Sequence, residues 1–124
     1  MTVRLREFEC GAVHHEHFHH RDHVHVAYEL VARHPYDVAL ARFVAGLRTI
    51  AAAAGDPTKV HMTITAAFVA GIAERQLRQP AATWEAFAAG NPELLEKSFI
   101  RRWYPAGELE TDIARKTFLL PIAR

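Results

Sequence analysis

Residues 14–30 read HHEHFHHRDHVHVAYEL and hold seven of the nine histidines in this 124-residue chain. From this stretch onward, histidines and apolar residues recur with a helical spacing: His20, His23, Val24, Ala27, Leu30, Val31 and His34. Steps of three and four residues place them on one face of a helix, which we expect over about 18–33. Pro35 ends this helix, because proline pushes the residue before it out of the α region.

The same spacing of apolar residues predicts two further helices. The second begins at Pro35, which suits a first helical turn, and its apolar stripe is Leu40, Phe43, Val44, Leu47, Ile50, Ala51 and Ala54. Gly55-Asp56-Pro57 is a short break that predicts an antiparallel hairpin with the third helix. Thr58 is the expected N-cap of that helix, which runs to about 77–79 and carries His61, Ile64, Phe68 and Ile72 on its core face.

The remaining segments are short. We expect an extended segment around Val3, Leu5 and Phe8, short helices after Thr83 and Asn91, another over 108–116, and an apolar tail over 118–122 that packs back on the bundle. The predicted fold is therefore all-α: an antiparallel bundle of three main helices plus short C-terminal helices, in a single helical domain over 1–124.

Composition excludes several classes of partner. The net charge is +1 with histidines neutral, so no large basic field indicates nucleic-acid binding. The single cysteine, Cys10, excludes an internal disulfide framework and favours a cytoplasmic protein. No apolar run approaches the roughly 20 residues of a membrane span. Pairing of apolar faces into a homodimer is compatible with the sequence.

Three histidines are in phase with the core rather than with solvent. His20 and His23 lie three apart on one helix, and His61 shares a face with the apolar residues of another. A buried neutral imidazole needs partners for both nitrogens, and a divalent metal can satisfy several imidazoles together. The sequence therefore predicts a metal site at His20, His23 and His61, for zinc, iron, copper or manganese, with open coordination positions typical of catalytic sites.

Other side chains could contribute to this site. His19 is the candidate fourth ligand, and Thr65 could hydrogen-bond a substrate. Asp22 and Glu29 fall on the far face of the first helix, and Asp22 could instead lie in its first turn. The remaining histidines of the stretch are interpreted as a solvated segment: His14, His15, His17 and His25.

The function that this site favours is a metal-dependent enzyme acting on a small molecule. One alternative is a non-catalytic metal-binding protein, such as a sensor or carrier, with a saturated site. Another is a helical interaction module with structural histidines, which predicts no stoichiometric metal. Separately, the cluster Arg101-Arg102-Trp103-Tyr104 could meet an anionic substrate by charge and stacking, although packing of Trp103 is the simpler interpretation.

Two segments, FHHRDHVHVAYEL (18–30) and KVHMTIT (59–65), resemble a family of small bacterial proteins. The family pattern is an aromatic residue followed by H-x-x-H-[LV] at the start of a helix, and later K-x-H-x-T-I-T. The tail ARKTFLLP (114–121) is also similar, and the matching site positions are His20, His23, His61, Thr63 and Thr65. Family members often have an acidic residue where this chain has Met62, and this departure puts a carboxylate ligand there in doubt. The resemblance implies positions but no particular activity.

Overall fold

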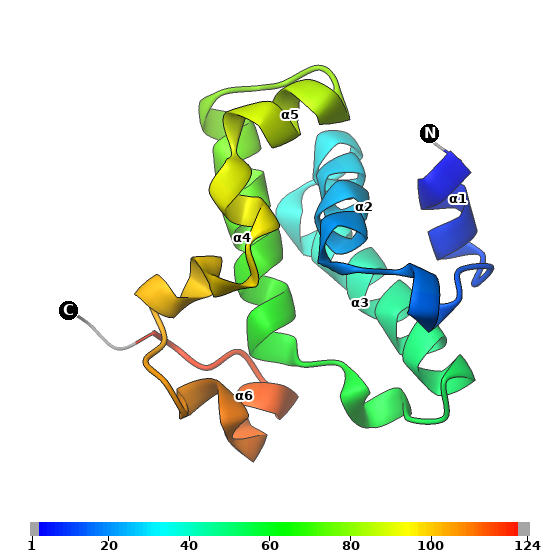
Figure 1. Cartoon of the computed structure of the whole chain (residues 1–124), viewed down its shortest axis with the longest axis vertical. Coiled ribbons are helices and arrows are strands. Elements are labelled where there is room, and N and C mark those ends of the chain that lie inside the picture. The colour runs from blue at the N-terminus through cyan, green and yellow to red at the C-terminus, as the bar shows by residue number, and fades with distance from the viewer. Residues whose placement is uncertain (1–2, 122–124) are drawn as a thin grey trace.

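The structure is a computed structural model that describes residues 3–121, apart from the side chains of Val3 and Pro57. Its bundle consists of α2 (His20–Arg33), α3 (Tyr36–Ala53) and α4 (Met62–Arg78), and residues 3–121 contain no strand. In Figure 1, α2 lies between α4 and α3, and it packs against both. The prediction of an all-α bundle of three main helices is confirmed.

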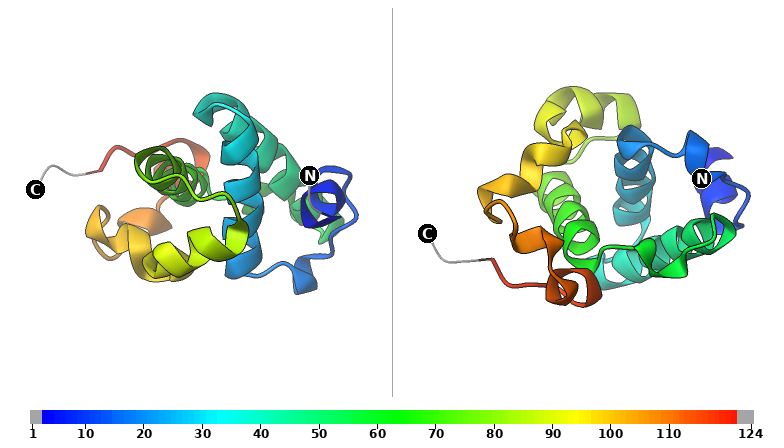
Figure 2. Two further views of the ribbon diagram at one scale, coloured as in Figure 1. Left: turned by 90° about the horizontal axis from the view of Figure 1, so that it is seen from above. Right: turned by 60° about the horizontal axis from the view of Figure 1, so that its bottom comes forward.

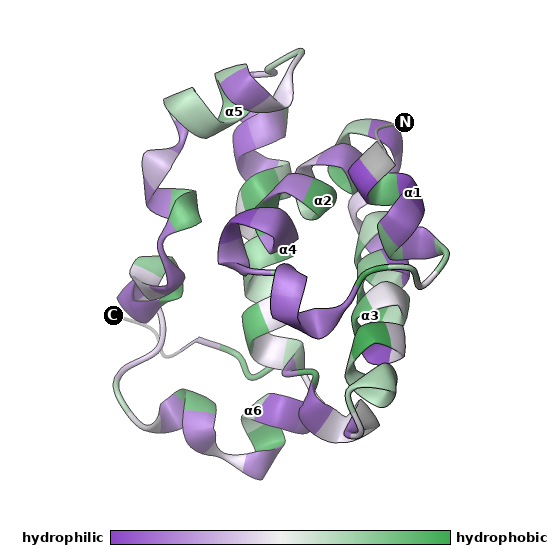
Figure 3. Ribbon diagram, turned by 45° about the vertical axis from the view of Figure 1, so that its right-hand side comes forward, coloured by the Kyte–Doolittle hydropathy of each residue, from purple (hydrophilic) through white to green (hydrophobic). Residues whose placement is uncertain are grey.

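Each long helix buries the apolar face that its spacing predicts. Figure 3 shows apolar stretches on these helices, whereas the histidine-rich segment leading into α2 is hydrophilic. The fully buried side chains include Val24 and Leu30 of α2 and Val69 and Ile72 of α4. Burying a side chain of this size contributes roughly 1.5–3 kcal/mol, so these faces hold the bundle together.

The N-terminal segment is a helix, α1 (Val3–Glu9), so the expected extended conformation is wrong. Leu5 and Phe8 are fully buried, and the Phe8 ring stacks on Phe18 at 5.3 Å and on Phe43 at 5.5 Å. Leu5 and Phe8 are three residues apart, which places both on one face of a helix but on opposite faces of a strand. The helical conformation therefore lets both side chains be buried on the same side.

Replacing Gly46 by alanine should destabilise the protein by up to about 2 kcal/mol. A Cβ on Gly46 of α3 would overlap the Phe8 ring, and overpacking of this kind costs about 1–3 kcal/mol. Alanine recovers about 1 kcal/mol of helix propensity, which is smaller than the expected clash. Urea unfolding measures the difference. Gly90→Ala is the matched control, because nothing lies within 4 Å of a Cβ there; equal midpoints for the two variants would contradict the docking of α1.

The chain after α4 first passes over the end of α2 and then follows α4 on the side away from α1, as Figures 1 and 2 show. It consists of α5 (Trp84–Gly90), η3 (Pro92–Leu95), η4 (Lys97–Arg102), η5 (Glu108–Glu110) and α6 (Asp112–Lys116). The helix expected over 108–116 is thus divided into η5 and α6. The short helix predicted after Thr83 is α5, and Thr83 caps it by accepting a hydrogen bond from the backbone N–H of Ala86.

The tail returns to α4 through side-chain hydrogen bonds. The Thr63 hydroxyl donates to the Thr117 carbonyl and accepts from the Leu119 N–H, both at 2.9 Å. The Tyr104 hydroxyl donates to the Leu119 carbonyl at 2.7 Å. The prediction that the apolar tail packs back is confirmed for Leu119, which packs against the core, whereas Phe118 and Leu120 are exposed and Ile122 lies outside the described residues.

Candidate functional site

Three adjoining cavities open between α2, α4 and the segments beside them, and His23 lines all three. The inner cavity, about 50 Å³, is also lined by His20 and Thr65. The His61 cavity, about 440 Å³, is lined by His23, His61 and Thr65. The outer cavity, about 910 Å³, is lined by His20 and His23. His23 therefore occupies the centre of the candidate site.

His23 is held by aromatic contacts. Its ring lies 4.5 Å from the Phe18 ring and 6.2 Å, edge-on, from the Phe43 ring. Within residues 3–121, no hydrogen bond reaches either ring nitrogen. Burial, helped by the nearby His20, lowers the pKa of His23 to about 4. At neutral pH, His23 is thus an uncharged imidazole with an unused lone pair beside the cavities.

His20 is the second imidazole, from the first turn of α2. Its Nε2 lies 3.0 Å from the Leu94 carbonyl, and since a carbonyl can only accept, Nε2 carries the proton. Nδ1 then has a free lone pair. Burial lowers the pKa of His20, although the bond to Leu94 opposes this shift. Both histidines of α2 are therefore neutral bases with a nitrogen available to a ligand.

His61 has a different role from the one predicted, because it is itself the N-cap of α4. Its Nδ1 accepts a hydrogen bond from the Ile64 N–H at 3.1 Å, and its Nε2 donates to the Leu109 carbonyl at 2.6 Å. The expected cap, Thr58, instead lies in η2 (Pro57–Lys59), where Asp56 holds its backbone N–H. Both ring nitrogens of His61 are thus engaged in this conformation.

The structure brings the three predicted ligands to adjoining cavities but not to one point. His20 and His23 share the inner cavity, and His23 and His61 share the next. The potential ligand atoms of His20, His23 and His61 do not all lie within 4.8 Å of one another. Among the described residues, one group of three potential ligands meets this spacing: His14, His15 and Glu16. The metal site at His20, His23 and His61 remains a prediction.

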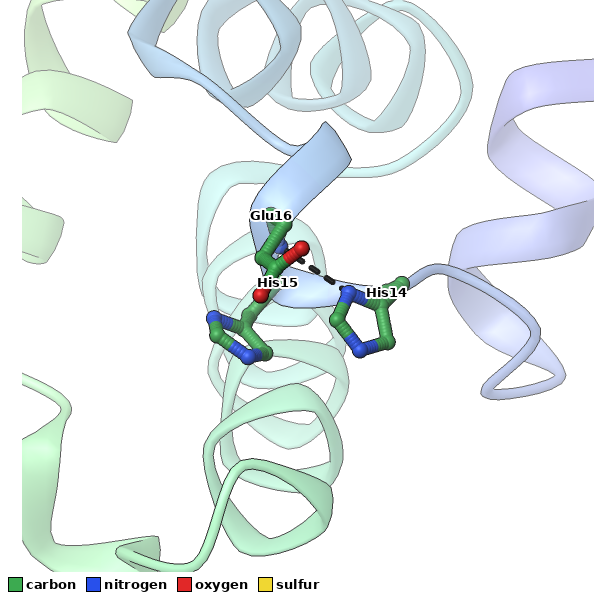
Figure 4. A group of neighbouring side chains, drawn as sticks. All are labelled: His14, His15 and Glu16. Carbon is green, nitrogen blue, oxygen red and sulfur yellow. Dashed lines mark hydrogen bonds between the residues drawn. The ribbon is translucent and has the colours of Figure 1, made fainter.

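The group His14, His15 and Glu16 lies on the surface, in the segment before α2 (Figure 4). The His14 and His15 rings are 4.5 Å apart, and His14 Nδ1 accepts a hydrogen bond from the Glu16 N–H at 3.2 Å. All three side chains are exposed, as the interpretation of a solvated segment requires. They supply a useful control for the half-buried His20 and His23.

His25 departs from that interpretation. It is half-buried and stacks on Trp84, with ring centroids 4.4 Å apart and planes 6° apart. Its buried Nε2 has no hydrogen-bond partner in the described chain and lies 3.7 Å from a Glu29 carboxylate oxygen. Glu29 is buried as well, although the sequence spacing placed it on the far face. Both line a separate cavity beside Trp84, away from His23.

The other candidates take supporting positions. Asp22 lies in the first turn of α2, as one of the two interpretations expected, and accepts a hydrogen bond from the His19 N–H at 2.9 Å. His19 lines the outer cavity, and the buried Thr65 lines the other two. Among cationic residues, Lys59 and Lys97 were not singled out in the sequence, because neither belongs to a motif and they are far apart in the chain.

Comparison of the chain with protein-family models, curated proteins and solved structures finds no match. No helix within residues 3–121 is long and apolar enough to cross a membrane. The arrangement of the side chains around His23 is therefore the basis for a proposal on function.

Proposed function

We propose that this protein is a metal-dependent enzyme that acts on a small molecule through a divalent metal held by His20, His23 and His61. The observation that carries the proposal is the state of His23: a half-buried, neutral imidazole that no hydrogen bond within residues 3–121 engages, facing three cavities. The lone pair of a neutral imidazole nitrogen that no protein group uses is available to a divalent metal.

His20 supports the proposal because its bond to Leu94 fixes the tautomer. A histidine that ligates a metal donates its other ring N–H to a carbonyl or carboxylate, which orients the ring. The contact between His20 Nε2 and the Leu94 carbonyl has this character and leaves Nδ1 for the metal.

His61 would have to exchange partners to become the third ligand. Ligation through Nε2 replaces the bond to Leu109 and also puts the proton on Nδ1, which ends the cap on Ile64. A helix cap and a hydrogen bond contribute about 1 kcal/mol each. Binding of structural zinc contributes about 10 kcal/mol or more, which exceeds the cost of breaking both hydrogen bonds of His61.

The chemistry follows from a three-histidine site with open positions. The metal would supply Lewis acidity to a substrate in the adjoining cavities. Thr65 is buried and lines two of these cavities, so its hydroxyl is placed to hydrogen-bond the substrate.

Metal uptake by untagged protein tests the proposal. We expect wild type to bind one equivalent of zinc, iron, copper or manganese, measured by elemental mass spectrometry. Both His20→Ala and His23→Ala should weaken binding by about 100-fold or more, because losing only an outer partner of a ligand costs 10–100-fold. His61→Ala should also lose the stoichiometric metal.

The double variant His14→Ala/His15→Ala is the matched control and should keep its metal. If the double variant lost its metal while His23→Ala kept it, binding would be assigned to the surface group of His14, His15 and Glu16, and the proposal would be overturned. Stoichiometric metal without turnover of any small molecule would favour the non-catalytic sensor or carrier.

A second candidate is a helical interaction module with structural histidines. The engaged nitrogens of His61 favour it, since they stabilise α4 without a metal. This candidate expects no metal uptake by wild type, and it expects chelators to leave the unfolding temperature unchanged.

A further inference from the structure

We propose that the substrate at this site is a small molecule carrying a doubly charged oxyanion such as a phosphate group, bound where the His61 cavity and the outer cavity meet. The inference names the substrate class and therefore rests on the proposed function for the identity of the site. Its evidence, however, comes from lysine and arginine side chains that play no part in holding a metal.

Cationic side chains from three segments converge on these two cavities. Lys59 of η2 and Lys97 of η4 line both of them. Arg101, one turn after Lys97, and Arg21 of α2 line the outer cavity. The sequence brings these residues from positions up to 80 apart, so the tertiary structure creates the cationic surface.

None of these four cations forms an ion pair with another described residue, whereas five other arginines do. Arg21 contacts the Trp84 ring, 5.5 Å from its centroid, which leaves its charge uncompensated. All four side chains are exposed, so their like charges are gathered on one surface of the molecule. An anion placed between them would balance those charges, and arginine suits phosphate through its forked pair of N–H donors.

No carboxylate lines any of the three cavities among the described residues. The nearby Asp22 is already engaged, by the His19 N–H and by Arg4 at 3.4 Å. A site for an organic cation would show the opposite arrangement, with acidic side chains on the cavity wall. The charge distribution therefore selects an anionic ligand.

Lys97 also shares cavity walls with the imidazoles. It lines the outer cavity with His20 and His23, and the His61 cavity with His23 and His61. One ligand in these cavities can therefore contact both the lysine and a histidine. An oxyanion at Lys97 and Lys59 would hold the rest of a small molecule beside His23.

Calorimetric titration of inorganic phosphate into the full chain, kept metal-free with EDTA, tests this inference. Ionic strength is held constant with sodium chloride. We expect saturable binding, weakened at least tenfold by Lys97→Gln and by Lys59→Gln. Lys116→Gln is the matched control, because Lys116 lines neither cavity, and it should change the affinity less than twofold. Acetate, with one charge, should bind at least tenfold more weakly than phosphate.

Equal affinities in wild type and all three variants would mark the phosphate as an adventitious ion only and overturn the inference. Absence of binding at millimolar phosphate would overturn it too. Thermal unfolding of each variant establishes that the fold is retained. The titration contains no metal, so the two proposals are tested separately. Phosphate binding without metal uptake would overturn only the metal proposal. Metal uptake without phosphate binding would overturn only the inference about the substrate class.

Discussion

Between pH 7 and pH 5, metal-free protein should lose about 2 kcal/mol of its unfolding free energy through His23 alone. Burial lowers the pKa of His23 to about 4, from 6.5 for the exposed side chain of the unfolded chain. In the unfolded state, the His23 side chain therefore binds a proton below pH 6.5, whereas in the folded state it binds one only near pH 4. The folded state keeps its full stability above pH 6.5 and loses it progressively as the pH falls to 4. Burial also lowers the pKa values of His20 and His25, which adds to the loss.

Urea unfolding at a series of pH values in EDTA measures this effect. His23→Leu places an apolar side chain beside Phe18 and Phe43 that cannot bind a proton. The unfolding free energy of this variant should therefore fall less steeply toward pH 5 than that of wild type. His17→Leu, on the exposed segment before α2, controls for the change in composition. If wild type and His23→Leu had the same pH dependence, the pKa of His23 would not be lowered in the folded protein, and this prediction would be wrong.

Replacing Thr63 by valine should cost about 2–4 kcal/mol and release the C-terminal tail. The Thr63 side chain is fully buried, and its hydroxyl satisfies both the Thr117 carbonyl and the Leu119 N–H. Valine has nearly the same shape but can neither donate nor accept. Each buried backbone group left without a partner costs about 1–3 kcal/mol, unless the tail detaches and regains water.

Urea unfolding and amide hydrogen exchange separate these two outcomes. We expect a lower unfolding free energy together with faster exchange of the Leu119 amide. Thr49→Val is the control, since Thr49 is exposed on α3 and its hydroxyl donates only to the Ala45 carbonyl within the same helix. If Thr63→Val were as stable as Thr49→Val and its Leu119 amide still exchanged slowly, the Thr63 hydroxyl would not hold the C-terminal tail on α4.

Local sequence decided most of the bundle. The apolar spacing of α2, α3 and α4 and the breaks at Pro35 and at 55–57 predict the three long helices, because each signal acts within one or two turns of the chain. Asp22 in the first turn of α2 was predictable for the same reason.

The candidate site was predictable only in part. Spacing placed His20 and His23 beside the core, where both line the inner cavity. The engagement of His61 could not be predicted, because its Nε2 binds a carbonyl 48 residues away in η5. The interpretation of His25 as solvated failed in the same way, because the ring of Trp84 covers it.

The sequence by itself thus determined the three helices and the inward positions of two histidines. Tertiary structure alone decided that Phe8 packs against Phe43, that His61 Nε2 binds the Leu109 carbonyl, and that Lys59 and Lys97 line the same cavities. The physical reason is the range of the interactions. Helical periodicity and proline act on near neighbours, whereas burial of Phe8, the bond to Leu109 and the convergence of lysines depend on segments that meet only after the chain has folded.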